Sequence, residues 1–250
     1  MLFALGIIKQ MFRQISIGAI KRGLAGSIIN SLQKRGFWET ICLVPKNGKY
    51  LLEQFLDRGF DLKWGTNTSG IDDEVVLRVP SKSATHAFGY QAVTPKEFRK
   101  ILAVSSLAID PNTTFVDMGS GKGRVLMMMA KQYPSLPIVG VEFSPELHDI
   151  ARNNIEIFCK KLGNRVNIKL HCMDAADYEF PDTSVVLFLF NPFGEVVMTQ
   201  VLSNLKCWYQ KFRNNLTVIY FDPTYKKLFD QQQFLIPKVL HDDICVYLGK

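Results

Sequence analysis

The sequence predicts an α/β protein of the doubly wound type, with a mostly parallel sheet flanked by helices. From residue 113 onward, short apolar runs typical of strands alternate with segments of helical periodicity. The runs are apolar throughout, which indicates strands that are buried on both faces of a parallel sheet. A chain of 250 residues, 47% of them hydrophobic, is long enough for one such domain preceded by an extension, or for two small domains.

Individual elements follow from the same patterns. Strands are expected at residues 113–117, 138–142, 166–170, 185–190, 216–221 and 244–248. Helices are expected between them, notably over 123–133 and over 145–162, where Ser144 is placed to cap the first turn. A further helix over 94–108 begins with Thr94 and Glu97, which have the spacing of a capping box.

These elements divide the chain into three parts. Residues 94–250 form the main domain, and residues 46–93 form a loop-rich segment that we expect to cap a cofactor or substrate. Within it, Asp61–Gly70 is rich in small hydrogen-bonding residues, so we expect a functional loop there. Residues 1–45 form a basic, amphipathic helical extension.

The positive charge is confined to the N-terminal part of the chain. Residues 1–50 contain eight of the 30 basic residues and one of the 23 acidic residues, which accounts for the whole net charge of +7. The rest of the chain is therefore neutral, and this disfavours a nucleic acid as partner. Three interpretations of residues 1–35 stay open: a helix that packs on the domain, a peripheral contact with an anionic membrane, and a cleaved organellar presequence.

Cysteine and histidine usage argues against a metal centre. The five cysteines include no C-x-x-C pair and the four histidines are scattered, so neither a zinc site nor a disulfide framework is expected. Reduced cysteines fit a cytoplasmic protein. No apolar run reaches the roughly 18 residues of a membrane span.

A glycine-rich turn follows the first expected strand and precedes a helix, in the run Phe115-Val-Asp-Met-Gly-Ser-Gly-Lys-Gly-Arg-Val125. Glycine permits a sharp turn and a close approach of ligand to backbone. A phosphate-binding loop would need Ser or Thr after Lys122, where Gly123 stands. A dinucleotide-binding turn would have a glycine at position 124, which is Arg124.

The arrangement D-x-G-x-G-x-G resembles motif I of class I S-adenosylmethionine-dependent methyltransferases, which have a Rossmann-like, seven-stranded sheet. The resemblance implies S-adenosyl-L-methionine as cofactor, held by Asp117, Gly119, Ser120, Gly121 and Gly123.

Two further segments fit a nucleoside ligand. Glu142 ends the second expected strand, where a carboxylate can accept hydrogen bonds from two ribose hydroxyls, and Phe143 can cover the adenine. After the third strand, the resemblance assigns Asp174 to the adenine amino group and the amide of Ala175 to a ring nitrogen. A helix-capping role is the alternative for Asp174.

The segment Asn191-Pro-Phe-Gly194 closes the fourth expected strand. It resembles the Asn-Pro-Pro-aromatic motif of methyltransferases that act on amino nitrogens, in which the Asn orients the target amine and also borders the cofactor. Asn191 and Pro192 match the motif, whereas Phe193 replaces the second proline and Gly194 the aromatic. We expect Asn191 to be catalytic and Pro192 and Phe193 to contact the acceptor.

The resemblance extends upstream of the main domain. The residues of 61–70, Tyr90 and the motifs above are similar to a largely uncharacterised group of bacterial methyltransferases, over residues 55–250. That group has Asp where Asn67 stands, so the loss of this charge would weaken one contact if the loop touches the cofactor. A more distant likeness is to protein lysine methyltransferases. We expect Tyr90, His86 and the 65–70 loop to close over the cofactor, with Tyr90 in a catalytic role.

The sequence thus predicts a methyltransferase whose acceptor it does not identify. An amino nitrogen of a protein is the favoured acceptor. The alternatives are RNA or DNA, a lipid or quinone-like small molecule reached through a membrane contact of residues 1–35, and a non-catalytic protein that binds the cofactor. The oligomeric state is not predicted.

Overall fold

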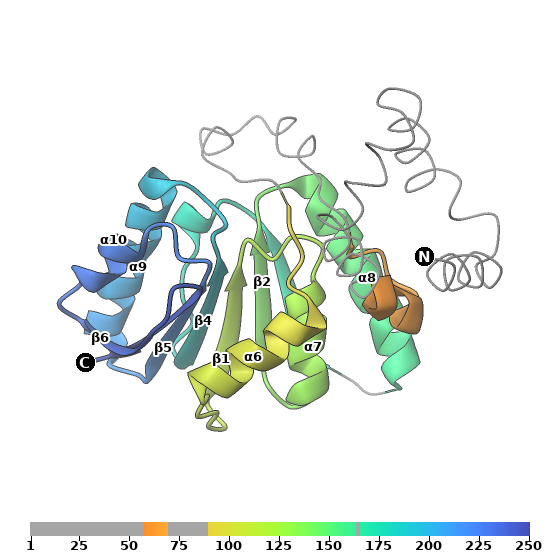
Figure 1. Cartoon of the computed structure of the whole chain (residues 1–250), viewed down its shortest axis with the longest axis horizontal. Helices are drawn as coiled ribbons and strands as arrows, with labels where there is room; N and C mark the ends of the chain where they lie inside the picture. The colour runs from red at the N-terminus through yellow and green to blue at the C-terminus, as the bar shows by residue number, and fades with distance from the viewer. Residues whose placement is uncertain (1–57, 70–89, 164–165) are drawn as a thin grey trace, which may run out of the picture. The chain divides into compact units, whose positions relative to one another are not determined.

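A seven-stranded sheet forms the centre of the computed structural model, which describes residues 58–69, 90–163 and 166–250 (Figure 1). The strand order is β3-β2-β1-β4-β5-β7-β6. Five strands run parallel to one another: β1 (Thr113–Met118), β2 (Ile138–Glu142), β3 (Ile168–Cys172), β4 (Ser184–Phe190) and β5 (Leu216–Phe221). The last two, β6 (Leu235–Leu240) and β7 (Ile244–Gly249), pair antiparallel. The predicted doubly wound, mostly parallel fold is confirmed.

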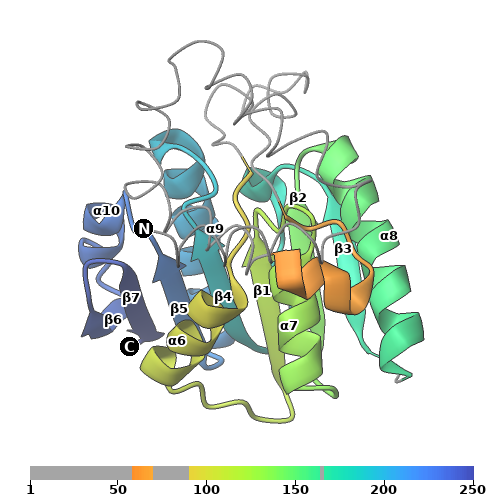
Figure 2. The same ribbon diagram turned by 45° about the vertical axis from the view of Figure 1, so that its right-hand side comes forward.

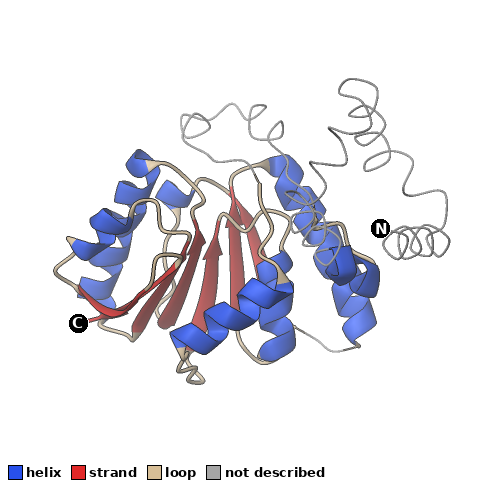
Figure 3. Ribbon diagram, in the orientation of Figure 1, coloured by secondary structure: helices blue, strands red, loops and turns tan. Residues whose placement is uncertain are grey.

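Helices cover both faces of this sheet, as Figures 2 and 3 show. One hydrophobic cluster joins a sheet face to α6 (Pro95–Ser105), α7 (Arg124–Gln132) and α8 (Pro145–Leu162). The other cluster joins the opposite face to η2 (Ala175–Asp177), α9 (Glu195–Phe212) and α10 (Lys226–Asp230). Phe115 and Val116 are consecutive in β1 and belong to different clusters, because successive side chains of a strand point to opposite faces.

Local signals set the helix starts. Thr94 and Glu97 form the expected capping box before α6, and the Leu147 amide donates to the Ser144 hydroxyl before α8. The strand β6 was not predicted, because Pro237 interrupts its pattern and most of its side chains are exposed. It is the edge strand, with an irregular register between Pro237 and Val239, and proline is tolerated in such a position.

Residues 58–64 are helical, so the expectation of a loop over the whole of 61–70 is wrong for residues 61–64. The cause is tertiary packing: Trp64 is buried, and its ring lies 4.5 Å from that of Phe158 in α8. Residues 66–69 have no regular secondary structure, as predicted. The basic extension, most of the loop-rich segment and His86 lie outside the described residues.

The chain reverses its winding direction between β1 and β4, which are neighbours in the sheet. The connections that leave the carboxyl ends of these two strands run to opposite sides, and this opens a crevice where ligands of such folds bind. None of the helices in the described ranges combines the length and apolarity needed to cross a membrane.

Candidate active site

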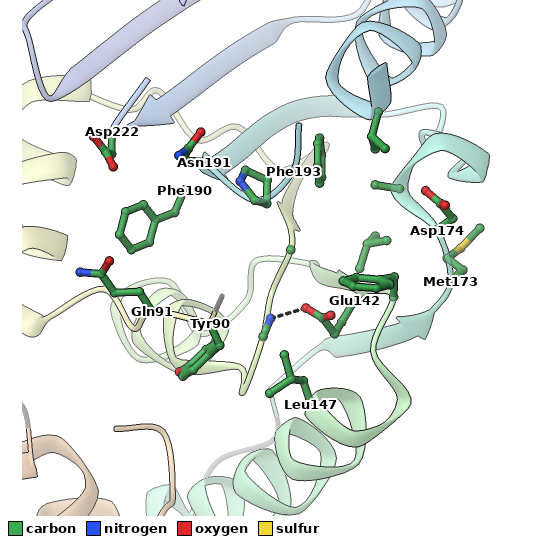
Figure 4. Close-up of a pocket in the computed structure, with 17 residues that line it drawn as sticks. Tyr90, Gln91, Glu142, Leu147, Met173, Asp174, Phe190, Asn191, Phe193 and Asp222 are labelled. Carbon is green, nitrogen blue, oxygen red and sulfur yellow. Dashed lines mark hydrogen bonds between the residues drawn. The ribbon is translucent and has the colours of Figure 1, made fainter. Parts of the chain in front are cut away.

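A cavity of about 250 Å³ lies in this crevice, at the carboxyl ends of the parallel strands (Figure 4). Most of the segments singled out in the sequence contribute to it. The predicted site residues among its lining are Tyr90, Gly119, Gly121, Glu142, Phe143, Asp174, Ala175, Asn191, Pro192 and Phe193. The other three residues predicted to bind the cofactor, Asp117, Ser120 and Gly123, lie in or beside the glycine turn but do not line the cavity.

The glycine turn after β1 is shaped by close packing. Gly119 has a φ of 80° and Gly121 a φ of 51°, in the left-handed region that favours glycine. A Cβ atom at position 119 would lie 2.3 Å from the Cβ of Pro192, and one at position 121 would lie 2.4 Å from the ring of Tyr90. The two glycines therefore leave room for Pro192 and Tyr90, and they expose the backbone of the turn to the cavity.

Glu142 is held in place by the backbone. Its side chain is only 4% exposed, and it accepts hydrogen bonds from the amides of Gly121 at 2.8 Å and Ser144 at 2.9 Å. Burial raises the pKa of Glu142, and the hydrogen bonds from backbone amides oppose that shift. The two backbone amides thus orient the carboxylate at the cavity.

Asp117 lies in β1, below the turn, and is 3% exposed. Burial, together with the nearby charge of Glu142, raises the pKa of Asp117 to about 8. Ser120 is also buried, and its Oγ points toward Gly140 of β2, within 2.9 Å of where a Cβ atom would lie there. Gly123 is the residue before α7 and has a φ of 83°. These three residues shape and support the turn from below.

The segment after β3 contributes Met173, Asp174 and Ala175 to the same end of the cavity as Glu142 (Figure 4). Asp174 accepts a hydrogen bond from the amide of Ala176 at 2.9 Å and so caps η2. The capping alternative is therefore realised, and the same residue also lines the cavity. Leu147 of α8 and Val197 of α9 add apolar surface that sequence reasoning missed.

Asn191 directly follows β4 and lines the other end of the cavity. Its φ is 38°, a left-handed conformation that Asn adopts more readily than most residues. Tyr220 of β5 donates a long hydrogen bond, 3.4 Å, to its Oδ1 atom. Phe193 is 7% exposed and packs in the core beneath α9, so it forms a wall of the cavity.

Tyr90 is anchored between the glycine turn and the preceding segment. Its hydroxyl donates to the backbone oxygen of Thr68 at 2.6 Å. The ammonium group of Lys122 lies 4.8 Å from the centre of its ring. Tyr90 and its neighbour Gln91 reach the cavity, whereas residues 66–69 do not.

Residues 66–69 instead bind a buried arginine. Asp61 accepts hydrogen bonds from the hydroxyls of Thr66, Thr68 and Ser69 and from the amides of Thr68 and Ser69. Burial would raise the pKa of Asp61, but these hydrogen bonds outweigh it and hold the pKa below its usual value. Arg124, which is 2% exposed, donates to the Thr68 and Ser69 hydroxyls and lies 3.6 Å from Asp61.

Asn67 is held in place through its backbone groups rather than its side chain. Asn154 of α8 binds the amide and the carbonyl of Asn67 through its own side-chain amide, at 2.8 and 3.0 Å. The same amide group also donates to the carbonyl of Lys122. The loop is thus tied to the start of α7, and the Asn67 side chain is exposed and outside the cavity.

Asp222 is the main functional candidate that sequence reasoning missed. It directly follows β5 and lines the cavity beside Asn191, together with Phe190 and Gln91 (Figure 4). The signal was present, because Glu142 and Asn191 stand at the carboxyl ends of β2 and β4, Glu142 as the last strand residue and Asn191 as the next residue. Extending that rule to the fifth strand would have found Asp222.

Comparison with known proteins gives a family match. A family model described as a methyltransferase domain matches residues 115–211. No curated protein matches the sequence. This segment contains the glycine turn, Glu142, Asp174 and Asn191, so the family match covers most of the cavity lining.

Several solved structures are distantly similar. An RNA methyltransferase from Salinibacter ruber in complex with S-adenosyl-L-homocysteine is 20% identical, with a TM-score of 0.42, over 64% of this chain and 92% of that one. A precorrin-6y C5,15-methyltransferase from Geobacter metallireducens is 13% identical, with a TM-score of 0.43, over 64% and 89%. An S-adenosylmethionine-dependent methyltransferase from Geobacter sulfurreducens is 20% identical, with a TM-score of 0.38, over 51% and 48%. Likenesses this distant carry no argument about the acceptor.

The residues of the cavity fit S-adenosylmethionine. The glycine turn keeps clear a cradle that Cβ atoms would fill, and the oriented carboxylate of Glu142 suits a pair of ribose hydroxyls. Phe143, Leu147 and Met173 supply apolar surface for an aromatic base beside Asp174. The chain therefore has a Rossmann-like fold and contains a methyltransferase domain over residues 115–211, whose cofactor is S-adenosylmethionine.

Proposed function

We propose that this enzyme methylates an amino nitrogen of a protein. The observation that supports this acceptor is Asn191, at the carboxyl end of β4, on the side of the cavity away from Glu142 and Asp174. An amide oxygen has two lone pairs, and the Tyr220 hydroxyl occupies one direction at 3.4 Å. The second lone pair is available to accept a hydrogen bond from the N–H of a target amine.

The charge of the cavity supports the same acceptor. Its described lining includes three carboxylates, those of Glu142, Asp174 and Asp222, and no lysine, arginine or histidine. A phosphate-rich acceptor would meet like charges there, and no cationic side chain of the described lining would pair with it. An amine, which carries a positive charge before it reacts, is the better match.

The chemistry requires alignment more than activation. The bound cofactor supplies a methyl group that its sulfonium already activates. Glu142 and the glycine turn hold the cofactor, while Asn191 orients the acceptor nitrogen and Pro192 and Phe193 restrict its approach. Orientation of two reactants of this kind contributes roughly 7–11 kcal/mol to lowering a barrier.

The test is Asn191→Gly in the full-length protein. Glycine keeps the φ of 38° without strain and removes the amide, whereas alanine would add backbone strain. With labelled S-adenosylmethionine and cell extract, we expect label in the protein fraction as methylated amines. We expect about a 100-fold loss of transfer in the variant, as for removal of one positioned polar group, with unchanged cofactor affinity.

Ser106→Gly is the matched control, since Ser106 has a φ of 45° at the end of α6 and does not line the cavity. Its transfer rate should equal that of the wild type. Label in nucleic acid or lipid would refute the proposed acceptor. Normal transfer by Asn191→Gly would remove Asn191 from the reaction.

A further inference from the structure

We propose that Asp222 selects the acceptor, because its carboxylate receives the positively charged ammonium form of the amine. This inference rests on the proposed function, which it deepens by naming the charge of the acceptor. Asp222 lies at the end of the cavity with Asn191, Phe190 and Gln91, apart from Glu142 and Asp174 (Figure 4). It is therefore placed where the acceptor enters.

The backbone holds Asp222 in an unusual conformation. Its φ is 49°, and four non-glycine residues in the described ranges have a positive φ. Two of them, Ser106 and Arg213, simply end helices α6 and α9. The other two are Asn191 and Asp222, which follow the neighbouring strands β4 and β5 and both line the cavity. Conformations of this kind concentrate at functional sites.

The backbone of Asp222 is held by two hydrogen bonds, whereas its carboxylate accepts none from the described residues. Its amide donates to the carbonyl of Asp243, and its carbonyl accepts from the amide of Thr224, both at 2.9 Å. Within the described part of the chain, no hydrogen bond or ion pair engages its side-chain oxygens. The other two carboxylates of the cavity each accept hydrogen bonds from backbone amides, Glu142 from two and Asp174 from one.

The surroundings of Asp222 suit a cation. Asn191 and Gln91 offer amide oxygens, and Phe190 offers an aromatic face, to which an ammonium group is attracted. Phe190 is held in place by Phe221, at 4.8 Å between ring centres. A carboxylate, two amides and an aromatic ring together recognise an alkylammonium ion and repel a carboxylate or phosphate.

The reaction step balances with this role. The ammonium R–NH₃⁺ binds at Asp222 and releases one proton to solvent water, which the exposed carboxylate adjoins. The lone pair of R–NH₂ then forms the N–CH₃ bond, directed by Asn191. The S–CH₃ bond of the cofactor breaks and its electron pair stays on sulfur, so that the product is R–NH₂⁺–CH₃. Asp222 is unchanged at the end.

The test compares Asp222→Asn with wild type in a binding experiment that needs no turnover. Asn has the same shape and accepts the positive φ, so the fold should be kept, and a melting curve checks it. The full chain is loaded with S-adenosylhomocysteine and titrated with n-butylammonium and with butyrate, followed by NMR. We expect the wild type to bind butylammonium and not butyrate, and the variant to bind butylammonium about 10- to 100-fold more weakly.

Asp242→Asn is the matched control, an exposed carboxylate near the start of β7 that does not line the cavity. It should behave as wild type. Equal binding of butylammonium by wild type and Asp222→Asn, or a preference of wild type for butyrate, would overturn the inference. The outcome is independent of the labelling test: label in nucleic acid refutes the proposed acceptor even if Asp222 binds the ammonium probe.

Discussion

The two ends of the cavity are built in different ways. The cofactor end is built around the glycine turn after β1 and Glu142, the last residue of β2, which are joined by a hydrogen bond from the Gly121 amide to the Glu142 carboxylate. The opposite end, where we propose that the acceptor binds (the acceptor end), gathers side chains from three distant segments, represented by Tyr90, Asn191 and Asp222. A backbone-built end tolerates little change, whereas an end built of side chains can change its specificity without loss of the fold.

The two ends of the cavity also differ in how their carboxylates are hydrogen-bonded. At the cofactor end, Glu142 is buried and bound by two backbone amides. Burial of Asp117, together with the nearby charge of Glu142, raises the pKa of Asp117. At the acceptor end, Asp222 is exposed, and within the described residues its carboxylate has no such donors. The bound carboxylate of Glu142 suits the two neutral ribose hydroxyls of the cofactor, and the exposed carboxylate of Asp222 suits a positively charged acceptor.

The largest effect is expected for Gly119→Ala, at the cofactor end. Its Cβ would lie 2.3 Å from that of Pro192, at a φ of 80°. Overpacking and left-handed strain together should lower the free energy of unfolding by ~2–4 kcal/mol. The shifted turn should also weaken binding of S-adenosylmethionine by at least ~100-fold, about 2.7 kcal/mol. Urea denaturation and calorimetric titration measure the two effects.

Gly163→Ala separates strain from crowding. Gly163 has a similar φ of 70° at the end of α8, but no atom lies within 4 Å of the added Cβ. The Gly163→Ala variant should have a free energy of unfolding lower by about 1–2 kcal/mol and an unchanged affinity for the cofactor. If both variants weaken cofactor binding equally, the contact with Pro192 is not what shapes the turn.

Asp117 should make the free energy of unfolding depend on pH, an effect of intermediate size. In the unfolded chain this carboxyl loses its proton near its usual value of 3.8, whereas in the native protein the pKa is raised to about 8. Between these values the native state holds the extra proton, so stability falls as pH rises, by up to ~1.4 kcal/mol per pH unit. The fall should end above about pH 8.

Urea denaturation of the cofactor-free protein between pH 6 and 9 measures this slope. Asp117→Asn has no titrating group at this position, so its slope should be clearly shallower. Burial also raises the pKa of Glu142, which leaves a residual slope of the same sign. A variant with the full wild-type slope would show that Asp117 is ionised in the native protein.

The smallest effect is expected for Tyr90→Phe, at the acceptor end. The change removes the 2.6 Å hydrogen bond to Thr68 but keeps the ring against Gly121. Stability should fall by ~0.5–1.5 kcal/mol. Transfer should fall several-fold as the residue loosens, while cofactor affinity stays within about twofold. A tenfold loss of cofactor affinity instead would assign Tyr90 to the cofactor end.

Local patterns predicted most of the fold. The bounds of α8 and the capping box before α6 follow from cap residues and periodicity over neighbouring residues. Six of the seven strands follow from apolar runs, although β3 begins two residues later than expected. The edge strand β6 was not predicted, because its exposed side chains and Pro237 interrupt the apolar pattern of a strand. Residues 61–64 were misassigned because the burial of Trp64 against Phe158, which stabilises the helix, joins positions far apart in sequence.

The sequence by itself determined the cofactor and predicted the main residues of the cofactor end, since a glycine turn and a strand-end carboxylate are short-range features whose spacing can be read directly from the sequence. Only the tertiary structure decided how the acceptor end is assembled. Asp222 reaches Asn191 because β5 pairs with β4, and Tyr90 reaches the turn because Thr68 is tied to Arg124 and Asp61. A strand-end rule can single out Asn191 and Asp222 in the sequence, but it cannot place them side by side, because that depends on strand order. The position of Tyr90 likewise depends on a buried charge network between residues far apart in sequence.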